Sequence, residues 1–445
     1  MKGFNSQPAF KIRAPEFSRR VDSIFRKGRG TPIVQSEYIY SADQGRFYKI
    51  SELENCVSLL QTASINIERV RNWLHEMKTF LEDQGYRSFK AQVPVSVING
   101  FIEDRLMQIK AVSENASFQG RAIFNGDCGT GAEVKGRKLR FVRGSARVES
   151  SSSAGYPIAI YQPPEPSVLT GSAPLSEENL KKESMIVLAD GQQEVRYRIN
   201  EHEDAESLIK NLQRCLRDDG FDISVYVTQD NRLYFRHNQL GTATAFKGSS
   251  YLTRIVSECP GEFKEADLGK NIEGTIGTEQ AHGNGGFLIG NEGNPRTDGL
   301  IIYFDGVVDF PGQVVGNVNV QQNGIKVPIS SSGDEVEILS VPSIQPELLA
   351  VGVPNQSGFE NLSTIRANTV FECRDALKLI VWSISDLEYL QEDLKFDENK
   401  YVDRAVELLR STMSTRAAGE EIFNFSKTKA KDMVEQLRSM MPDPA

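Results

Sequence analysis

The chain has 445 residues, of which 39% are hydrophobic and 25% are charged, and its formal net charge at pH 7 is −9. This composition is typical of a folded protein rather than a disordered one, and the length predicts two to four domains. The acidic balance disfavours non-specific binding to nucleic acid and to anionic membrane surfaces. Because no apolar run approaches the ~20 residues of a membrane-spanning helix, we expect no membrane insertion.

The first twenty residues, MKGFNSQPAFKIRAPEFSRR, contain neither an apolar core nor a small-residue cleavage site. We therefore expect either a cytosolic protein or one exported with its start intact. The cysteines and histidines are scattered without metal-ligand spacing, which predicts reduced thiols and no metal site. They are Cys56, Cys128, Cys215, Cys259, Cys373, His75, His202, His237 and His282.

Two helices are expected after residues 1–50, which are basic and interrupted by glycine and proline. Apolar residues of the stretch 51–84 recur at spacings of three and four, which predicts a helix with a heptad seam that ends at Gly85. Pro94 precedes a second helix, residues 95–115. The packing positions expected in these helices and in the turn after them are Leu53, Val57, Leu60, Ile67, Leu74, Met77, Leu81, Ile102, Ile109, Phe118 and Phe124.

The middle of the chain holds β-branched runs between glycines and prolines. Residues 134–148 alternate in polarity and residues 156–161 form an apolar run, so both predict strands. Residues 163–174 contain four prolines, which predicts a linker. Residues 285–345 predict further strands divided by glycine-rich turns.

Residues 185–246 predict a compact ββαββ module. Two strands, near 185–188 and 195–199, flank an Asp-Gly turn, and an amphipathic helix follows over residues 204–216. Two more strands are expected at 223–227 and 233–235. The order of elements therefore favours a small α+β domain inserted in the chain.

The C-terminal part is helical again. From Thr369 the apolar and small residues follow unbroken steps of four and three up to Leu394, and we expect Asp397 and Asn399 to break the helix. A further helix is predicted over residues 401–440. The packing positions expected in the two helices are Ile380, Leu387, Leu390, Leu394, Leu408 and Ile422.

Several segments resemble the bacterial flagellin family, and they occur in the family's order. At the N-terminal side they are Val57-Ser-Leu-Leu-Gln-Thr-Ala63, Glu68-Arg-Val-Arg71 and Asn115-Ala-Ser-Phe-Gln-Gly-Arg-Ala-Ile-Phe-Asn-Gly126. At the C-terminal side they are Leu362-Ser-Thr-Ile-Arg-Ala367, Asp375-Ala-Leu377 and Ser414-Thr-Arg-Ala-Ala-Gly-Glu-Glu-Ile-Phe-Asn-Phe-Ser426. The segment 222–235 and Leu240-Gly241 resemble a flagellin hook IN module. Residues 1–50, the early end and the five cysteines depart from the family pattern.

The resemblance implies an α+β fold, in which long antiparallel N- and C-terminal helices form a rod and β-rich outer domains are inserted between them. The expected divisions are residues 1–50, a diverged N-terminal segment; 51–126, the N-terminal rod; 127–180, a β-rich connection with the proline-rich linker; 181–260, the IN-like module; 261–345, an outer β-rich domain; and 346–445, the C-terminal rod.

The resemblance also implies a non-enzymatic structural subunit of an extracellular flagellar filament. Such a subunit assembles with itself or other flagellins and leaves the cell through the type III channel without a cleaved signal. An export chaperone and cap or junction proteins are the further partners it implies. Two alternatives stay open: a hook–filament junction protein, and a non-flagellar adhesin or binding module with a helical stalk.

No catalytic residue, metal ligand or cofactor site is predicted. The glycine-rich segments 129–131 and 283–286 lack the lysine and the strand–helix frame of a phosphate loop. The serines 150–153 lack a nucleophile elbow. The carboxylates Asp386, Glu388, Glu420 and Glu421 are expected on solvated helix faces rather than as acid–base pairs.

Overall fold

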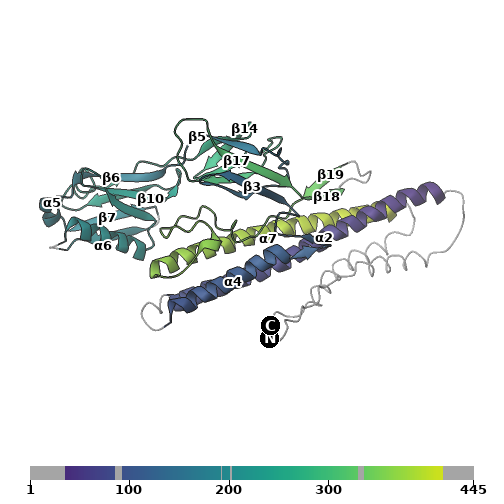
Figure 1. The fold of residues 1–445 in the computed structure, drawn as a ribbon, viewed down its shortest axis with the longest axis horizontal. Helices are drawn as coiled ribbons and strands as arrows, with labels where there is room; N and C mark the ends of the chain where they lie inside the picture. Colours follow the sequence, from purple (N-terminus) through teal and green to yellow (C-terminus); the bar gives the residue numbers. More distant parts are fainter. Residues whose placement is uncertain (1–35, 86–92, 192, 201–202, 329–334, 414–445) are drawn as a thin grey trace. The chain divides into compact units, whose positions relative to one another are not determined.

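The structure is a computed structural model that describes residues 36–85, 93–191, 193–200, 203–328 and 335–413 (Figure 1). It is a mixed helix and sheet protein, with helices at both ends of the described chain and β-rich domains between them. Residues Ser51–Leu409 form one compact unit, and every contact described below lies within it. No helix in the described part of the chain is long and apolar enough to cross a bilayer.

The N-terminal helix α2 spans Ser36–Phe80, continues as a π-helical turn, Leu81–Gly85, and thus ends at the predicted glycine. It begins well before residue 51, so part of the segment expected to be irregular is helical. The reason is that no proline lies between Pro32 and Pro94, and an isolated glycine such as Gly45 lowers helix stability without breaking it. The second helix, α4, spans Val95–Asn115 as predicted, directly after Pro94.

The C-terminal helix α7 runs without interruption over Val370–Met413. The expected break at Asp397 and Asn399 is wrong, because these residues disfavour a helix interior by only ~0.7 kcal/mol each relative to alanine. The buried residues continue through this stretch at intervals of seven. They are Cys373, Ile380, Leu387, Leu394, Tyr401 and Leu408. The part of the predicted 401–440 helix after Met413, including Ile422, lies outside the described residues.

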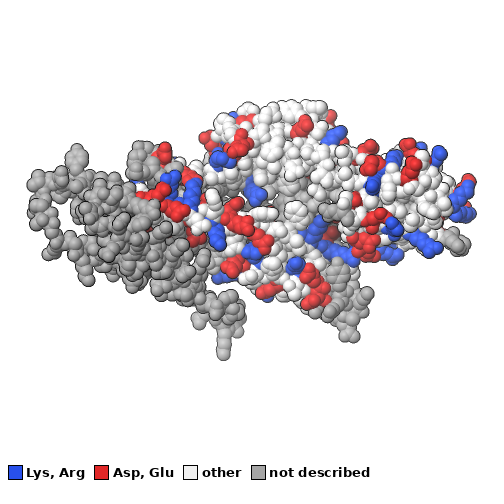
Figure 2. Space-filling view, turned by 180° about the vertical axis from the view of Figure 1, so that it is seen from behind, with Lys and Arg blue, Asp and Glu red and all other residues white. Residues whose placement is uncertain are grey.

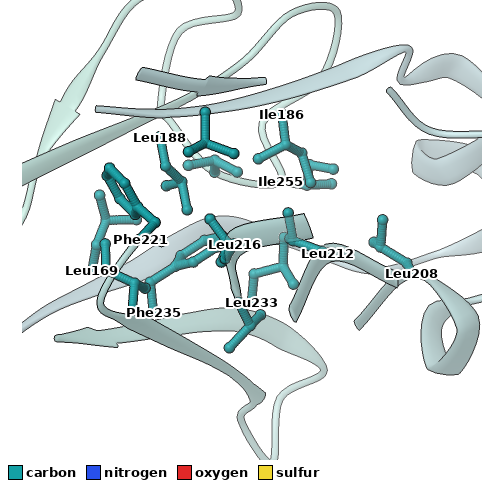
Figure 3. Packing of buried hydrophobic residues seen from close by; sticks show 14 of the residues in the cluster. Leu169, Ile186, Leu188, Leu208, Leu212, Leu216, Phe221, Leu233, Phe235 and Ile255 are labelled. Atoms are coloured by element: carbon teal, nitrogen blue, oxygen red, sulfur yellow. The ribbon is translucent and has the colours of Figure 1, made fainter. Parts of the chain in front are cut away.

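The ββαββ elements form as predicted: β7 Met185–Asp190, β8 Glu194–Arg198, α6 Ala205–Asp218, β9 Ile223–Val227 and β10 Arg232–Leu240. The module also recruits β6 Pro166–Pro174, β11 Phe246–Ser250 and β12 Lys264–Glu265. Its two sheets have the orders β6-β10-β9 and β12-β11-β7-β8. Both enclose one core with α6, to which Leu169, Leu212 and Phe235 contribute (Figure 3).

The proline-rich segment is therefore mainly a strand and not a linker. Pro166 and Pro174 stand at the two ends of β6, where a missing N–H costs the sheet little. Between them β6 pairs with β10, as in Phe235 with Leu169. A short helix, α5 Glu177–Lys182, then leads into β7.

The second β domain is a single eight-stranded sheet with the order β3-β17-β5-β13-β14-β15-β16-β4. The strands are β3 Thr130–Gly136, β4 Leu139–Arg143, β5 Tyr156–Gln162, β13 Glu273–Ile276, β14 Glu279–Asn284, β15 Phe287–Gly290, β16 Ile301–Phe304 and β17 Gln313–Gln322. The two outermost strands, β3 and β4, are joined by only two residues. The sheet must therefore curl around its apolar core, which includes Ile158, Leu288 and Val318.

This sheet changes the expected domain organisation. Residues 134–148 hold two strands separated by a turn at Lys138, whose φ is 61°. The segments expected as a connection and as a separate outer domain belong to one sheet, and the module is inserted between its neighbouring strands β5 and β13. A small hairpin, β18 Ile325–Pro328 with β19 Val336–Leu339, follows the sheet. A two-residue pair, β1 Ser117–Phe118 with β2 Arg121–Ala122, precedes it.

Candidate assembly surface

Helices α2 and α7 pack antiparallel, although their paired residues are more than 290 positions apart in the chain. In successive contacting pairs, the residue number of the α2 partner increases while that of the α7 partner decreases. The pairs are Gln61 Nε2 to Glu398 Oε1 at 2.8 Å, Gln391 Nε2 to Ser64 Oγ at 3.3 Å, Arg71 to Glu388 at 2.5 Å, and Cys373 Sγ to the carbonyl of Leu81 at 3.8 Å. Residues 61–81 and 373–398 thus lie side by side in one helical rod (Figure 1).

Helix α4 completes the rod through aromatic and ionic contacts with the end of α2. The rings of Phe80 and Phe101 lie 4.3 Å apart, and the guanidinium of Arg105 lies over the Phe101 ring at 5.0 Å. Arg105 also pairs with Glu76 at 2.9 Å. The apolar stacking and the charge pair fix α4 against α2 at neighbouring positions.

Most of the sequence-predicted packing residues are buried inside this single chain. The buried ones are Leu53, Leu60, Ile67, Leu74, Met77, Leu81, Ile102, Ile109, Phe124, Ile380, Leu387, Leu394 and Leu408. Val57, Phe118 and Leu390 are half-buried. Since buried side chains cannot touch a neighbouring molecule, their predicted part in joining copies stays a prediction. These buried residues can contribute to contacts between copies only by stabilising the rod that presents the contacting surfaces.

Every exposed residue of α2 between Ser51 and Phe80 is polar. Its exposed residues up to the π-helical turn are Ser51, Glu68, Arg69, Asn72, His75, Glu76 and Thr79. Such a face is suited to contact with water, as expected for the solvent side of an amphipathic helix.

The outer face of α7 instead carries three large aromatic side chains that sequence reasoning missed. Trp382, Tyr389 and Phe396 are 53%, 68% and 72% exposed, and we call them the aromatic ridge. Each follows a buried seam residue by two positions, which turns it roughly 200° around the helix. The ridge therefore runs along α7 on the side away from the buried seam. Its seven-residue spacing is visible in the sequence, but the spacing alone does not tell whether these rings are buried or exposed.

The rod is tied to the β module near the start of α7. Lys378 pairs with Asp222, and the guanidinium of Arg374 donates to the carbonyl of Arg217 at 2.5 Å. Asp375 accepts hydrogen bonds from the backbone N–H groups of Gln356 and Ser357, at 3.0 and 2.8 Å. A cavity of about 210 Å³ lies among these groups. Because these charged groups already bond one another, the cavity offers little to a ligand.

The turn that ends the N-terminal rod has a defined geometry. Phe124 is fully buried, and the side-chain oxygen of Asn125 accepts from the N–H of Asp127 at 2.9 Å. Gly126 has a φ of 99°, and a Cβ there would come within 3.2 Å of the Cα of Gly131. Glycine is therefore required where the chain leaves the rod and enters β3.

The described residues contain no group of three or more His, Cys, Asp or Glu side chains placed to hold a metal ion. Gly129 directly precedes strand β3, which begins with Thr130 and Gly131, and Gly283 lies inside β14, so neither segment opens a helix as a phosphate loop does. Glu388 pairs with Arg71, and burial raises the pKa of Asp386. Glu420 and Glu421 lie outside the described residues.

No family model matches the chain, and no curated protein matches it. Among solved structures it is similar to flagellar hook-associated protein 3 from Legionella pneumophila, with 10% identity, 92% of this chain and 100% of that one covered, and a TM-score of 0.30. It is also similar to the D1-D2-D3 domains of the flagellar cap protein FliD from Escherichia coli, with 9% identity, 75% of this chain and 76% of that one covered, and a TM-score of 0.30. A third similar structure is FliC from Burkholderia pseudomallei, with 11% identity, 78% of this chain and 99% of that one covered, and a TM-score of 0.26. At these values the similarity assigns neither a family nor an activity to the chain.

Proposed function

We propose that the chain is a non-enzymatic structural subunit of a bacterial flagellar filament, which polymerises through the sides of its helical rod. The aromatic ridge carries the proposal. Three large aromatic rings exposed in a row on one helix face are costly to leave in water, and exposed aromatic side chains are enriched at interaction sites. The antiparallel terminal helices and the flagellin-like segments at both ends of the chain support the same role.

The rod and the β domains have separate tasks in this proposal. The rod supplies the contacts between copies, because its outer face carries the ridge. The inserted β domains project from the rod and need not take part in polymerisation. The subunit reaches the outside of the cell through the flagellar type III channel, and its partners are other copies, other flagellins, an export chaperone and cap or junction proteins.

Electron microscopy of the purified protein tests the proposal. We expect concentrated wild-type protein to form filaments, alone or seeded with flagellin. The variant Trp382→Ser/Tyr389→Ser/Phe396→Ser should stay monomeric while its circular dichroism spectrum is unchanged. A matched control is Val307→Ser/Phe310→Ser, two residues exposed by 88% and 59% on a β16–β17 loop, which should assemble normally. Filaments formed equally well by the ridge variant would contradict the proposal.

The insertion of the module gives a second test. Gln162 and Glu273 are paired partners on β5 and β13, so residues 163–272 can be replaced by an Asn-Gly turn between these strands. The shortened chain should still form filaments. If it fails to assemble while its rod stays folded, the division of labour between rod and β domains is wrong.

Two alternatives are separated by other observations. A hook–filament junction protein shares the rod but is present in few copies, so a labelled copy would mark one point at the filament base rather than its length. A surface adhesin with a helical stalk is favoured by the exposed pair Val307 and Phe310, which suits a ligand contact. It predicts that the Val307→Ser/Phe310→Ser variant loses cell-surface or matrix binding and that no filament forms.

A further inference from the structure

Helix α4 exposes four apolar or small residues, with Glu103 and Asp104 between them, on the side away from its buried residues Ile98, Ile102 and Ile109. Val97 and Met107 are 52% and 70% exposed, and Gly100 and Ala111 are exposed on the same side. We call these four residues the α4 strip. A Cβ built on Gly100 meets nothing within 4 Å, so the fold of one copy does not require a glycine there.

The strip and the aromatic ridge match in length. Trp382 to Phe396 and Val97 to Ala111 each cover fourteen residue steps, which is about 21 Å along a helix. Both lie on the outer sides of helices that pack against α2 in the same rod. One surface is a row of large protruding rings, and the other has low side chains at Gly100 and Ala111 between Val97 and Met107.

We infer that the aromatic ridge of one copy docks on the α4 strip of a second copy. This inference rests on the proposed function and specifies its contact. Because ridge and strip are different surfaces of the chain, the contact is heterologous, and each copy retains a free ridge at one end and a free strip at the other. Heterologous contacts that do not close a ring generate an open helical polymer.

The area of the contact sets its strength. A fully buried aromatic side chain covers about 150–250 Å², so the exposed parts of the three ridge residues amount to about 400 Å². With a similar area on the strip, the contact buries roughly 800 Å² in total, less than the ~1,200–2,000 Å² of a stable pair. A lone pair of copies is therefore weakly bound, and association through this contact depends on protein concentration.

Charge makes the contact sensitive to salt. The exposed charges on α4 are Glu103, Asp104, Glu114 and Lys110, and those beside the ridge on α7 are Glu392, Asp393 and Lys395, so acidic groups outnumber basic ones on both surfaces. On the face drawn in Figure 2, acidic and basic side chains are interspersed and neither sign covers it alone. Two surfaces with an excess of acidic groups repel each other, so added salt should strengthen association by screening them. A contact held by opposite charges would weaken instead.

Two variants that each lose one half of the contact test the inference. The ridge variant is Trp382→Ser/Tyr389→Ser/Phe396→Ser, and the strip variant is Gly100→Arg/Met107→Asp. All five positions are exposed, so both proteins should fold, as thermal melts and circular dichroism would verify. Gly100→Ala is the control and should assemble as the wild type does.

Analytical ultracentrifugation of each variant and of their 1:1 mixture gives the outcomes. We expect each variant alone to be monomeric, with self-association at least ~10-fold weaker than wild type. The mixture should form dimers and stop there, because only one ridge and one strip remain intact in each pair. Dimers of the strip variant alone would mean that ridges pair with ridges, and the inference would be overturned.

The test also separates this inference from the proposed function. If the strip variant polymerises like the wild type, the partner of the ridge lies elsewhere on a second copy, and the filament proposal stands without this contact. If the wild type remains monomeric at all concentrations, even with added salt and flagellin seeds, then the filament proposal fails together with the inference.

Discussion

Helices α2 and α7 bury matching seams against each other, yet they present different faces to solvent. The outer face of α2 is polar at every exposed residue in its described compact part, whereas α7 exposes Trp382, Tyr389 and Phe396 in one row. A helix that serves only to complete a monomer needs the first kind of face. The difference indicates that α7 packs against α2 with one side, while its opposite side is available for contact with another molecule.

The largest expected effect on stability comes from placing a charge on the buried side of α7 instead of its exposed side. Leu387 is almost fully buried in the seam, while Tyr389 lies two residues further on the ridge. Leu387→Asp should lower the free energy of unfolding by ~4 kcal/mol or more, because it places an unpaired charge among apolar side chains. Tyr389→Asp should change it by ~0.5 kcal/mol at most. Urea melts of both variants check this, and equal losses would remove the distinction between the two faces.

A change in the β module should leave both faces of α7 intact. Glu183 is buried and accepts hydrogen bonds from the backbone N–H groups of Tyr251, Leu252 and Thr253, at 3.0, 3.0 and 2.7 Å. Glu183→Gln turns an N–H donor toward these donors and should destabilise the module by ~2–4 kcal/mol. Hydrogen exchange should report faster opening of β7 and β11 with unchanged protection in α7.

The pH dependence of the module follows from the same carboxylate. Burial alone would raise the pKa of Glu183, but hydrogen bonds from Thr253, Met185 and Leu252 outweigh it and hold the pKa below its usual 4.5. Because the pKa is lower in the folded state, ionised Glu183 stabilises the fold above pH 4.5. This stabilisation is lost as the pH falls through the folded-state pKa. Glu183→Gln should remove this acid-dependent loss, and a variant with the wild-type pH profile would contradict it.

The paired side of α2 contains a carboxylate with the opposite behaviour. Burial raises the pKa of Glu54 from 4.5 to about 7. The folded rod therefore favours protonated Glu54, and its stability falls as the pH rises from 4.5 through 7. Glu54→Gln should leave stability unchanged at pH 4 and raise it by about 1–3 kcal/mol at pH 8. Denaturant melts at the two pH values check the sign, and an equal change at both would argue against a buried Glu54.

The smallest effect is expected at the α4 strip. Gly100→Ala should stabilise the protein by ~0.5–1 kcal/mol, because alanine favours the helix and the added Cβ meets no neighbour. A thermal melt of the variant measures this. A loss of stability would mean that Gly100 is packed in the monomer and that the strip is not free.

The helical parts of the fold could be predicted because their signal is local. Pro94 and the spacing of Ile98, Ile102 and Ile109 place α4, and the seven-residue repeat places α7. The predicted break at Asp397 failed because weak propensity yields to a seam that continues through Tyr401. The β domains were harder, since strand order depends on pairings such as Val318 with Val134 that leave no local mark.

The candidate site divides in the same way. The buried positions of the rod follow from their periodicity, and the ridge repeats at the same interval, shifted by two residues. What the sequence could not supply is exposure: Trp382 and Ile380 look alike as apolar positions, and only the packing of α2 on α7 shows which of them faces outward. The α4 strip was invisible for the same reason.

The accessibility of Trp382 tests the central claim most directly. The chain has two tryptophans, so Trp73→Phe leaves Trp382 as the single tryptophan, whose emission can be excited selectively over that of the tyrosines. Acrylamide quenching and the emission maximum should be followed as the protein concentration rises through the onset of assembly. We predict that Trp382 is strongly quenched in the monomer, and that quenching falls and emission shifts to the blue in the polymer. A Trp382 that stays equally accessible in assembled protein would contradict the account.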